Sequence, residues 1–396
     1  MEKYTLPKGF VCGGIHSGVK KKRKDLSLIF SETSCKIAAV FTKNLVKAAP
    51  VVLAEKDLKK IDNVNAIVIN SGNANCMTGN RGLKDACTIR DIAAKELGVN
   101  KNKVMVSSTG IIGEYMPVAV ITSAIPALVL SLTKDGINDA ADGIMTTDKF
   151  RKIRMEKFSV GGKKVTMTAI AKGAGMIEPN MATMLCYVVT DAKISNKALK
   201  KALVCACEVS FNSITVDGDM STNDTLMILS NGEAENKTIT ESGKDYNVFL
   251  EKLKLILIDL AKMIVCDGEG ATKLIEVKVS GAKTNSDAKI AAKAIASSLL
   301  VKCAVLGEDP NWGRIASSVG SSGACFNPDK MKIELDGIVF YKSGKAVYPK
   351  KSEIKNVFKN KAVKINVDLK AGKCSHEMFS CDISKKYITL NAHYTT

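Results

Sequence analysis

The fold is decided by the stretch Lys172-Gly173-Ala174-Gly175-Met176-Ile177-Glu178-Pro179-Asn180-Met181-Ala182-Thr183-Met184-Leu185. A lysine and two glycines open this stretch, and an apolar run that ends at Asp191 follows it. Alternating apolar residues bounded by glycine and proline are typical of strands joined by a loop. The pattern therefore predicts a glycine-rich loop between two strands, at 164–171 and 183–190.

Thr183 is the candidate nucleophile of this stretch. A threonine hydroxyl inside a chain has no built-in base. A cut between Ala182 and Thr183 makes the threonine a chain start, whose α-amine has a pKa of roughly 7.7–8.0 and can take the hydroxyl proton. Small Ala182 lets the hydroxyl approach its carbonyl closely, and an N→O acyl shift there would cut the chain. The ordinary alternative for an Ala-Thr pair in an apolar run is a plain β-strand.

The whole chain resembles the ornithine acetyltransferase family, also called bifunctional glutamate N-acetyltransferase. Members of this family are N-terminal threonine acyltransferases that cleave themselves. The resemblance runs from about residue 5 to the last residue, and its motifs occur in the family's order. They are residues 172–191, Asn70-Ser71-Gly72-Asn73-Ala74-Asn75, Ser107-Ser108-Thr109-Gly110-Ile111-Ile112-Gly113, Met145-Thr146-Thr147-Asp148, Cys266-Asp267-Gly268-Glu269-Gly270, Gly307-Glu308-Asp309-Pro310-Asn311-Trp312-Gly313-Arg314 and Asn391-Ala392-His393-Tyr394-Thr395-Thr396.

The resemblance also implies an architecture, a layered α/β/α fold of the self-processing N-terminal-nucleophile acyltransferase type. Two cleavage fragments stay intertwined in that fold. The alpha fragment, 1–182, would carry the oxyanion hole and the glycine loop. The beta fragment, 183–396, would begin at the threonine nucleophile and close the site with its C-terminal strands. The family suggests two copies of each fragment, a heterotetramer. Periodicity alone predicts only a mixture of α and β elements, with helices such as 83–97 and 246–265. Ser195 is a plausible cap for a helix that runs to 209, Ser286 for a helix at 287–300, and residues 387–391 are predicted to form a strand.

An acyl transferase of this kind must stabilise a tetrahedral oxyanion and hold an amino-acid carboxylate. The family places its oxyanion hole on Thr109-Gly110, a small-residue turn that can aim two donors at one oxygen. Lys172 is expected to hold the substrate carboxylate, or to favour the neutral amine of Thr183 through like-charge repulsion. Its ordinary alternative is an exposed loop lysine.

Further substrate contacts follow from the resemblance. One of Thr146 and Thr147 should donate a hydroxyl hydrogen bond to the substrate, and Thr146 is favoured slightly. Glu269 offers a carboxylate for the amine of ornithine or for the α-ammonium of the incoming amino acid; its alternative is a surface glutamate in a turn. Asn391 and Thr396 lie at the chain end, which is usually frayed, but the family folds these residues back into the site.

The implied reaction is acetyl transfer from N2-acetyl-L-ornithine to L-glutamate through an ester on Thr183. It gives ornithine and N-acetylglutamate for arginine biosynthesis. The ester stores the acetyl group without a cofactor, and the sequence leaves open whether acetyl-CoA is a second donor substrate. The nearest rival function is an N-terminal-nucleophile aminopeptidase or amidohydrolase of the same fold class, in which water accepts the acyl group.

The formal net charge of +18 invites a nucleic-acid-binding hypothesis. The lysines are scattered, however, and the one dense run, Lys20–Lys24, has no interleaved aromatics for base stacking. A solvated turn before a strand at 26–30 is the favoured interpretation. The positive field would also attract small anionic substrates such as amino-acid carboxylates. A basic nucleic-acid-binding protein therefore stays a remote alternative.

The remaining composition predicts a cytoplasmic protein. No apolar stretch reaches the ~18–20 residues of a membrane span, and the N-terminus has no apolar signal core. The 12 cysteines form no Cys-x-x-Cys pair, which favours free thiols in a reducing compartment. The segment Asp217-Gly218-Asp219 lacks the spacing of a calcium loop, and we predict no metal.

Overall fold

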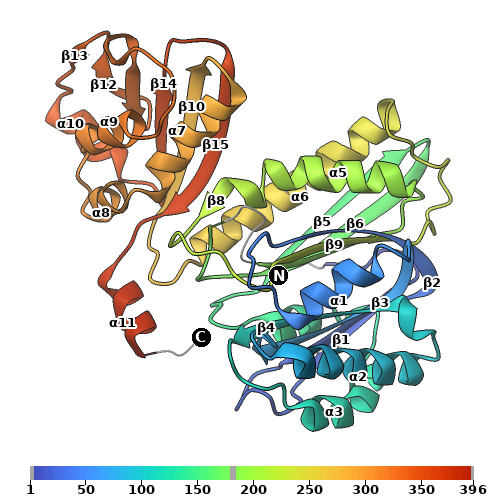
Figure 1. The fold of residues 1–396 in the computed structure, drawn as a ribbon. Helices are drawn as coiled ribbons and strands as arrows, with labels where there is room; N and C mark the ends of the chain where they lie inside the picture. The colour runs from blue at the N-terminus through green and yellow to red at the C-terminus, as the bar shows by residue number, and fades with distance from the viewer. Residues whose placement is uncertain (1–3, 179–183, 394–396) are drawn as a thin grey trace.

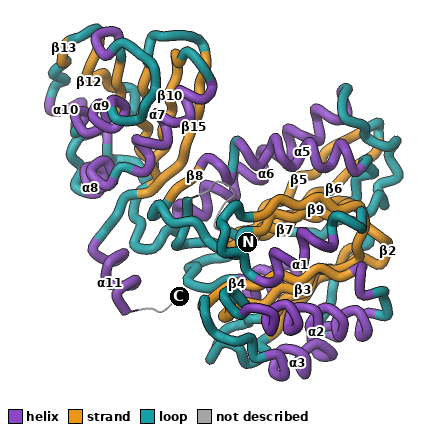
Figure 2. The backbone as a smooth tube through the Cα atoms, viewed as in Figure 1, coloured by secondary structure: helices purple, strands orange, loops and turns teal. Residues whose placement is uncertain are grey.

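The chain folds into two lobes in a computed structural model, which describes residues 4–178 and 184–393 (Figure 1). An eight-stranded mixed sheet forms the centre of the larger lobe, and a seven-stranded mixed sheet dominates the smaller one. Each sheet has its own buried apolar core. Helices and strands follow one another along almost the whole chain (Figure 2). The layered α/β class predicted from the sequence is confirmed.

One long strand, β2 (Leu26–Phe41), joins the two halves of the larger sheet. Its first part pairs with β3 (Asn63–Asn73), and its second part pairs with β9 (Thr225–Ser230). The register shifts between Phe30 and Cys35, where the strand passes from one partner toward the other. Irregular pairing of this kind bends a strand. The sheet therefore divides into two half-sheets that face each other.

Helices cover the outer faces of both half-sheets (Figure 1). On the β3 side the cover consists of α2 (Gly79–Leu97) and α3 (Val118–Leu130), whose buried residues pack on β2, β3 and the following strand. On the other side it consists of α5 (Asn196–Glu208) and α6 (Lys244–Cys266). The layers thus run helix, strand, strand, helix, so the predicted layered fold contains two strand layers between its helices.

A third apolar core fills the space between the half-sheets. Ile67 of β3 and Tyr187 of β7 (Leu185–Thr190) both belong to it. The neighbouring Cys186 points the other way, into the core under α5 and α6, as strand alternation requires. Helix α4 (Ile137–Ile144) contributes its buried face to the same inner core.

The predicted cleavage site lies between β6 (Lys163–Lys172) and β7, which are antiparallel neighbours. Lys172 at the end of β6 pairs with Leu185 at the start of β7. Residues 179–183, and with them the predicted cut, are outside the described residues. On its other side β7 runs parallel to β9. Strands β9 and β7 of the predicted beta fragment therefore lie side by side within one sheet, between strands of the predicted alpha fragment.

The smaller lobe is built around β10 (Leu274–Ala282) and β14 (Ala362–Asp368), which are parallel. Strand β15 (Cys374–Cys381) pairs with β10 on the other side and runs antiparallel. Helix α7 (Asn285–Ser297) packs its alanine-rich face on this sheet. On its other edge β15 pairs with β8 (Ile214–Thr215), a short strand that lies in sequence between elements of the larger lobe. This pairing fastens the two lobes together.

None of the described helices is long and apolar enough to cross a membrane. The remaining elements connect or flank those above. They are β1 (Phe10–Ile15), α1 (Ala49–Asp57), β4 (Val104–Ile111), β5 (Lys152–Val160), α8 (Leu299–Leu306), α9 (Trp312–Gly320), β11 (Lys332–Leu335), β12 (Ile338–Lys342), β13 (Lys345–Ala346), α10 (Lys351–Val357), α11 (Lys385–His393) and three short 3-10 helices at 101–103, 211–213 and 328–330.

Of the two helix caps predicted from the sequence, Ser195 is correct, whereas the helix expected to begin near Ser286 is capped by Thr284. Ser195 caps α5, and its hydroxyl accepts a hydrogen bond from the N–H of Ala198 at 3.2 Å. A single helix predicted at 287–300 is wrong, because Ser298 interrupts it. Ser298 has extended backbone angles, and its hydroxyl accepts from the N–H of Val301 to begin α8.

The strand predicted at 387–391 is also wrong, because these residues belong to helix α11. Their composition, with tyrosine, isoleucine, threonine and leucine, favours a strand. The local contacts favour a helix instead. The hydroxyl of Ser384 accepts from the N–H of Lys386 and donates to the carbonyl of Gly270, which fixes the start of the helix.

We expect the α5 face of the larger lobe to be essential for stability. Leu203 of α5 is fully buried, whereas the next residue, Val204, is 50% exposed. Leu203→Ala should lower the free energy of unfolding by about 2–5 kcal/mol, because it leaves a cavity. Val204→Ala should change it by less than about 0.5 kcal/mol. Urea denaturation of the two variants compares them directly, and equal midpoints would contradict this packing.

Candidate active site

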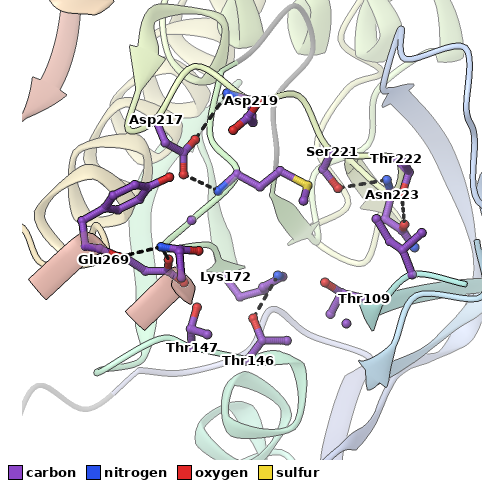
Figure 3. Close-up of a pocket in the computed structure, with 16 residues that line it drawn as sticks. Thr109, Thr146, Thr147, Lys172, Asp217, Asp219, Ser221, Thr222, Asn223 and Glu269 are labelled. Carbon is purple, nitrogen blue, oxygen red and sulfur yellow. Dashed lines mark hydrogen bonds between the residues drawn. The ribbon is translucent and has the colours of Figure 1, made fainter. Parts of the chain in front are cut away.

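A pocket of about 200 Å³ opens where the two lobes meet the loops of the larger sheet (Figure 3). The structure brings seven of the ten predicted site residues together in its wall. The other three, Ala182, Thr183 and Thr396, are outside the described residues. The seven are Thr109, Gly110, Thr146, Thr147, Lys172, Glu269 and Asn391.

The turn predicted at Thr109-Gly110 is wrong, because both residues belong to β4, which ends at Ile111 and pairs there with β3. Gly110 has a φ of +135°, and a Cβ built on it would lie 2.3 Å from the carbonyl carbon of Gly72 on the neighbouring strand. Only glycine fits such a close approach in this conformation. Thr109 is buried, and its side chain lies on the side of the pocket that holds Lys172 (Figure 3). The hydroxyl of Thr109 and the backbone N–H of Gly110 therefore lie at one fixed place.

Asn223 fixes the backbone next to Thr109 by hydrogen bonds, a role that the sequence did not reveal. Its side-chain amide donates to the carbonyls of Ser108 and Ala74, both at 2.7 Å. Its own carbonyl oxygen accepts from the hydroxyl of Thr222 at 2.6 Å. A buried amide with all of these partners fixes the backbone on both sides of it. In the sequence, the segment that precedes it resembles only a calcium loop, without the spacing of one.

Lys172 is buried, so the exposed-loop alternative is wrong. Its side chain is 9% exposed, and its ammonium donates to the hydroxyl of Thr146 at 3.3 Å. Burial lowers the pKa of Lys172, while the negative charges of Asp148 and Asp224 oppose that shift. A poorly hydrated ammonium of this kind attracts a substrate carboxylate strongly.

Beneath the pocket lies a fully buried ion cluster of Asp148, Lys152 and Asp267. The ammonium of Lys152 contacts Asp148 at 2.7 Å and Asp267 at 2.6 Å, and all three side chains are 0% exposed. Burial alone would raise the pKa of Asp148, but Lys152 and Lys172 outweigh it and lower the value to about 2. The pKa of Asp267 is raised by burial and only partly restored by Lys152.

The same two carboxylates fix three parts of the pocket wall. Asp148 accepts from the backbone N–H of Thr146 at 2.9 Å and from that of Gly173 at 2.8 Å. Asp267 accepts from the backbone N–H of Lys149 at 3.0 Å and lies two residues before Glu269. Three segments are therefore bound to one cluster: the loop that carries Thr146 (residues 145–149, the Thr146 or threonine loop), the glycine-rich loop after β6, and the end of α6.

Glu269 is buried too, which makes the surface-turn alternative wrong. It is 7% exposed, and its carboxylate accepts from the side-chain amide of Asn391 at 2.8 Å. Its N–H donates to the carbonyl of Ala174 at 2.9 Å. A Cβ at Gly175 would lie 2.6 Å from the carboxyl carbon, so the glycine makes room for it. Helix α11 thus brings Asn391 back to the pocket.

The mouth of the pocket carries acidic residues that sequence reasoning missed. Asp217 accepts from the N–H of Met176 at 2.6 Å and from that of Ile177 at 2.7 Å. Burial raises its pKa, and these N–H groups oppose the shift. Asp219 lies near it in the wall (Figure 3), and Tyr387 also lines the pocket. Within residues 4–178 and 184–393, no group of three His, Cys, Asp or Glu side chains is placed to hold a metal.

A smaller hollow behind Lys172 shows where the described chain resumes. Met184, the first described residue after the predicted cut, lines it together with Thr109 and Asp224. The carboxyl of Asp224 is buried, and burial raises its pKa well above the ordinary value. Met184 therefore lies close to Thr109 and to Lys172.

A layered α/β fold with hydroxyls, a buried ammonium and a buried carboxylate around one pocket defines an enzyme of the acyl-transfer class. Residues 11–396 match the model of the ArgJ family, and the chain belongs to that family. The resemblance to ornithine acetyltransferases stated from the sequence is thereby confirmed.

Individual relatives agree with this assignment. The arginine biosynthesis bifunctional protein ArgJ of Caldanaerobacter subterraneus is 48% identical over 100% of this chain and 98% of its own length. The crystal structure of the Bacillus halodurans ArgJ protein is 41% identical, covers 52% of this chain and 96% of its own, and has a TM-score of 0.50. The Mycobacterium tuberculosis ornithine acetyltransferase, solved in complex with ornithine, is 30% identical over 46% of this chain and 97% of its own, with a TM-score of 0.40.

We expect removal of Lys152 to destabilise the protein strongly. Lys152→Met leaves two carboxyls buried without a counter-ion and should cost about 3–5 kcal/mol in the free energy of unfolding. The folded-state pKa of those carboxyls then exceeds the unfolded value, so the native state binds more protons. The variant should therefore lose stability as pH rises from 5 to 8.

Lys149→Met is the matched control for this measurement. Lys149 lies 3.9 Å from Asp267 but is 45% exposed, and its loss should cost less than about 1 kcal/mol. Denaturant unfolding of both variants at pH 5 and pH 8 makes the comparison. A Lys152→Met variant as stable as the control would show that the cluster does not hold the pocket.

Proposed function

We propose that the chain transfers the acetyl group of N2-acetylornithine to glutamate through an acetyl ester on Thr183. As a member of the ArgJ family it is an acetyltransferase of arginine biosynthesis. The observation that carries the detailed proposal is the single pocket that gathers Thr109-Gly110, Lys172 and Glu269 around one small volume.

The reaction needs two acyl transfers of the same form. The α-amine of Thr183 takes the hydroxyl proton, and the hydroxyl oxygen attacks the acetyl carbonyl. The tetrahedral oxyanion is stabilised by the hydroxyl of Thr109 and the N–H of Gly110. Collapse breaks the amide bond, and ornithine leaves with the proton on its α-nitrogen. The neutral α-amine of glutamate then attacks the ester, and the Thr183 oxygen recovers a proton.

The charges of the pocket fit an amino-acid substrate. Lys172 would bind the α-carboxylate that acetylornithine and glutamate share. Glu269, held by Asn391, would bind an ammonium of ornithine or of the incoming amino acid. The hydroxyl of Thr146 accepts a hydrogen bond from the ammonium of Lys172. We therefore assign the substrate contact to Thr146 rather than to Thr147. Burial strengthens each of these interactions because water cannot screen them.

Self-cleavage into 1–182 and 183–396 is part of the proposal. The solved Bacillus halodurans polypeptide is matched over 96% of its length by 52% of this chain, so it is a little over half as long. That is the length expected of the beta fragment, the longer of the two. The pairing of β6 with β7 would keep the fragments together after the cut. Following the resemblance, we propose two copies of each fragment.

The compartment that we propose is the cytoplasm. No described cysteine forms a disulfide, and Cys12 and Cys186 are among those fully buried. Burial raises the pKa of the Cys186 thiol well above its ordinary value, which keeps it protonated and inert. A protein with 12 cysteines and no disulfide among its described residues fits a reducing environment.

Active protein should consist of two polypeptides, cut between Ala182 and Thr183. Scaling the mass of 42.4 kDa by fragment length gives roughly 19 and 23 kDa. Thr183→Ala should give one uncut, inactive chain, because nucleophile and base are both lost, whereas Thr183→Ser retains a hydroxyl and should still cut. Denaturing mass spectrometry, with an assay of N-acetylglutamate formation, checks both. A fully active uncut chain, or transfer by the alanine variant, would sink the assignment.

Glu269→Gln should weaken substrate binding without affecting the cut. The change keeps the shape and the Asn391 contact but removes the charge that would pair with an ammonium. Charge-assisted hydrogen bonds contribute about 1.5–3 kcal/mol, so KM should rise roughly ten- to a hundredfold for acetylornithine or glutamate. Glu251→Gln, a control on α6 with a side chain that is 68% exposed, should leave KM unchanged. Normal KM values for both substrates would remove Glu269 from the binding site.

A further inference from the structure

The basic run Lys20–Lys24 is a turn with three exposed residues, 21–23, and it lies next to the buried carboxylate of Asp25. Asp25 is 0% exposed and accepts from the backbone N–H groups of Ser17 at 2.6 Å and of Lys20 at 2.8 Å. Its own carbonyl accepts from the N–H of Ser71 on β3 at 2.8 Å. The turn expected here from the sequence is therefore attached to the sheet and has a defined shape.

Two side chains of this turn reach the loop that carries Thr146. The ammonium of Lys20 donates to the carbonyl of Met145 at 2.8 Å. The guanidinium of Arg23 donates to the carbonyl of Asp148 at 3.3 Å. Both ends of the threonine loop are thus held from outside the pocket by cations, while the carboxylate of Asp148 holds its inside.

The stem of Lys20 supports a second wall of the pocket. A Cβ built on Gly72 would lie 3.0 Å from the Cγ of Lys20, so the lysine stem packs directly over this glycine. Gly72 in turn is the strand partner of Gly110 and leaves no space for a side chain there. Lys20 therefore contacts both the Thr146 loop, at the Met145 carbonyl, and Gly72, the strand partner of Gly110.

We propose that Lys20 is a positioning residue for acetyl transfer. While its ammonium is charged, it keeps the Thr146 loop in a fixed position relative to Thr109-Gly110. Lys20 does not line the pocket and touches no substrate. It acts through the Met145 carbonyl, one residue from Thr146, and through Gly72. This inference rests on the proposed function, because its readout is the binding of the two substrates.

The surroundings of Lys20 make the contact sensitive to pH. Burial lowers the pKa of Lys20 to about 8; Asp25 and Asp148 oppose the shift, whereas Arg23 and Lys172 add to it. His16 also faces this turn, with its Nδ1 3.4 Å from Asp25. Lys20 is therefore mostly charged at pH 7 and loses its charge as pH rises above about 8. A neutral amine is a weaker donor, so the hold on the Met145 carbonyl weakens in that range.

Three variants test the proposal through KM and kcat for both substrates between pH 7 and pH 9.5. Lys20→Met removes the ammonium and should raise KM at pH 7 about tenfold, with little change in kcat. Lys22→Met removes the same charge from an exposed position of the same turn and should leave KM unchanged. Lys20→Arg keeps a cation that does not titrate below pH 12. It should therefore lose the rise in KM that the wild type shows above pH 8.

The outcomes separate this assignment from the proposed function. Equal KM values for Lys20→Met and Lys22→Met would overturn the positioning role. So would a Lys20→Arg variant whose KM rises above pH 8 as in the wild type, and this comparison also decides the matter if Lys20→Met does not fold. Failure of the wild type to transfer acetyl at all would overturn the proposed function itself and this inference with it.

Discussion

The buried cluster of Asp148, Lys152 and Asp267 is the constraint on which the pocket depends. Two carboxylates and one ammonium, all removed from water, stabilise a fold only when their remaining hydrogen bonds are also made. Backbone N–H groups from the threonine loop and the glycine loop supply those bonds. The electrostatic requirement of the cluster and the geometric requirement of the pocket are thus met by the same contacts. A segment that left its place would leave a buried charge without a partner.

Above the cluster, the pocket separates charge along its length. Thr109 lies on one side of Lys172, while Glu269 and Asp217 lie on the other side (Figure 3). A free amino acid carries both charges at once and can meet both ends. The low exposure of Lys172 and Glu269 makes each contact strong but also makes either group costly without a ligand. Hydrogen bonds to Thr146 and Asn391 compensate for part of that cost.

Short-range signals explain what the sequence could predict. Ser195 caps α5 because a serine hydroxyl reaches an N–H three residues away, and the glycine-rich stretch after β6 forms a loop for an equally local reason. The site residues came from motifs that resemble a family, and the structure brings the described ones together. Asn223 and Lys20 escaped prediction because their partners, Ser108 and Met145, lie 115 and 125 positions away along the chain. Helix α11 escaped because its start is fixed by Gly270, far away in sequence.

The strand order of the larger sheet restricts how such a protein can be made. Chain starts normally lie at the surface, where they are free to move. A cut at Ala182–Thr183 would instead create a chain start beside β7, a strand enclosed by β6 on one side and β9 on the other. If the chain is cut there, the sheet would have to be complete before the cut. Two separately synthesised halves would each expose unpaired strand edges, which invite aggregation. Synthesis as one polypeptide ensures that the halves meet in equal numbers and fold together.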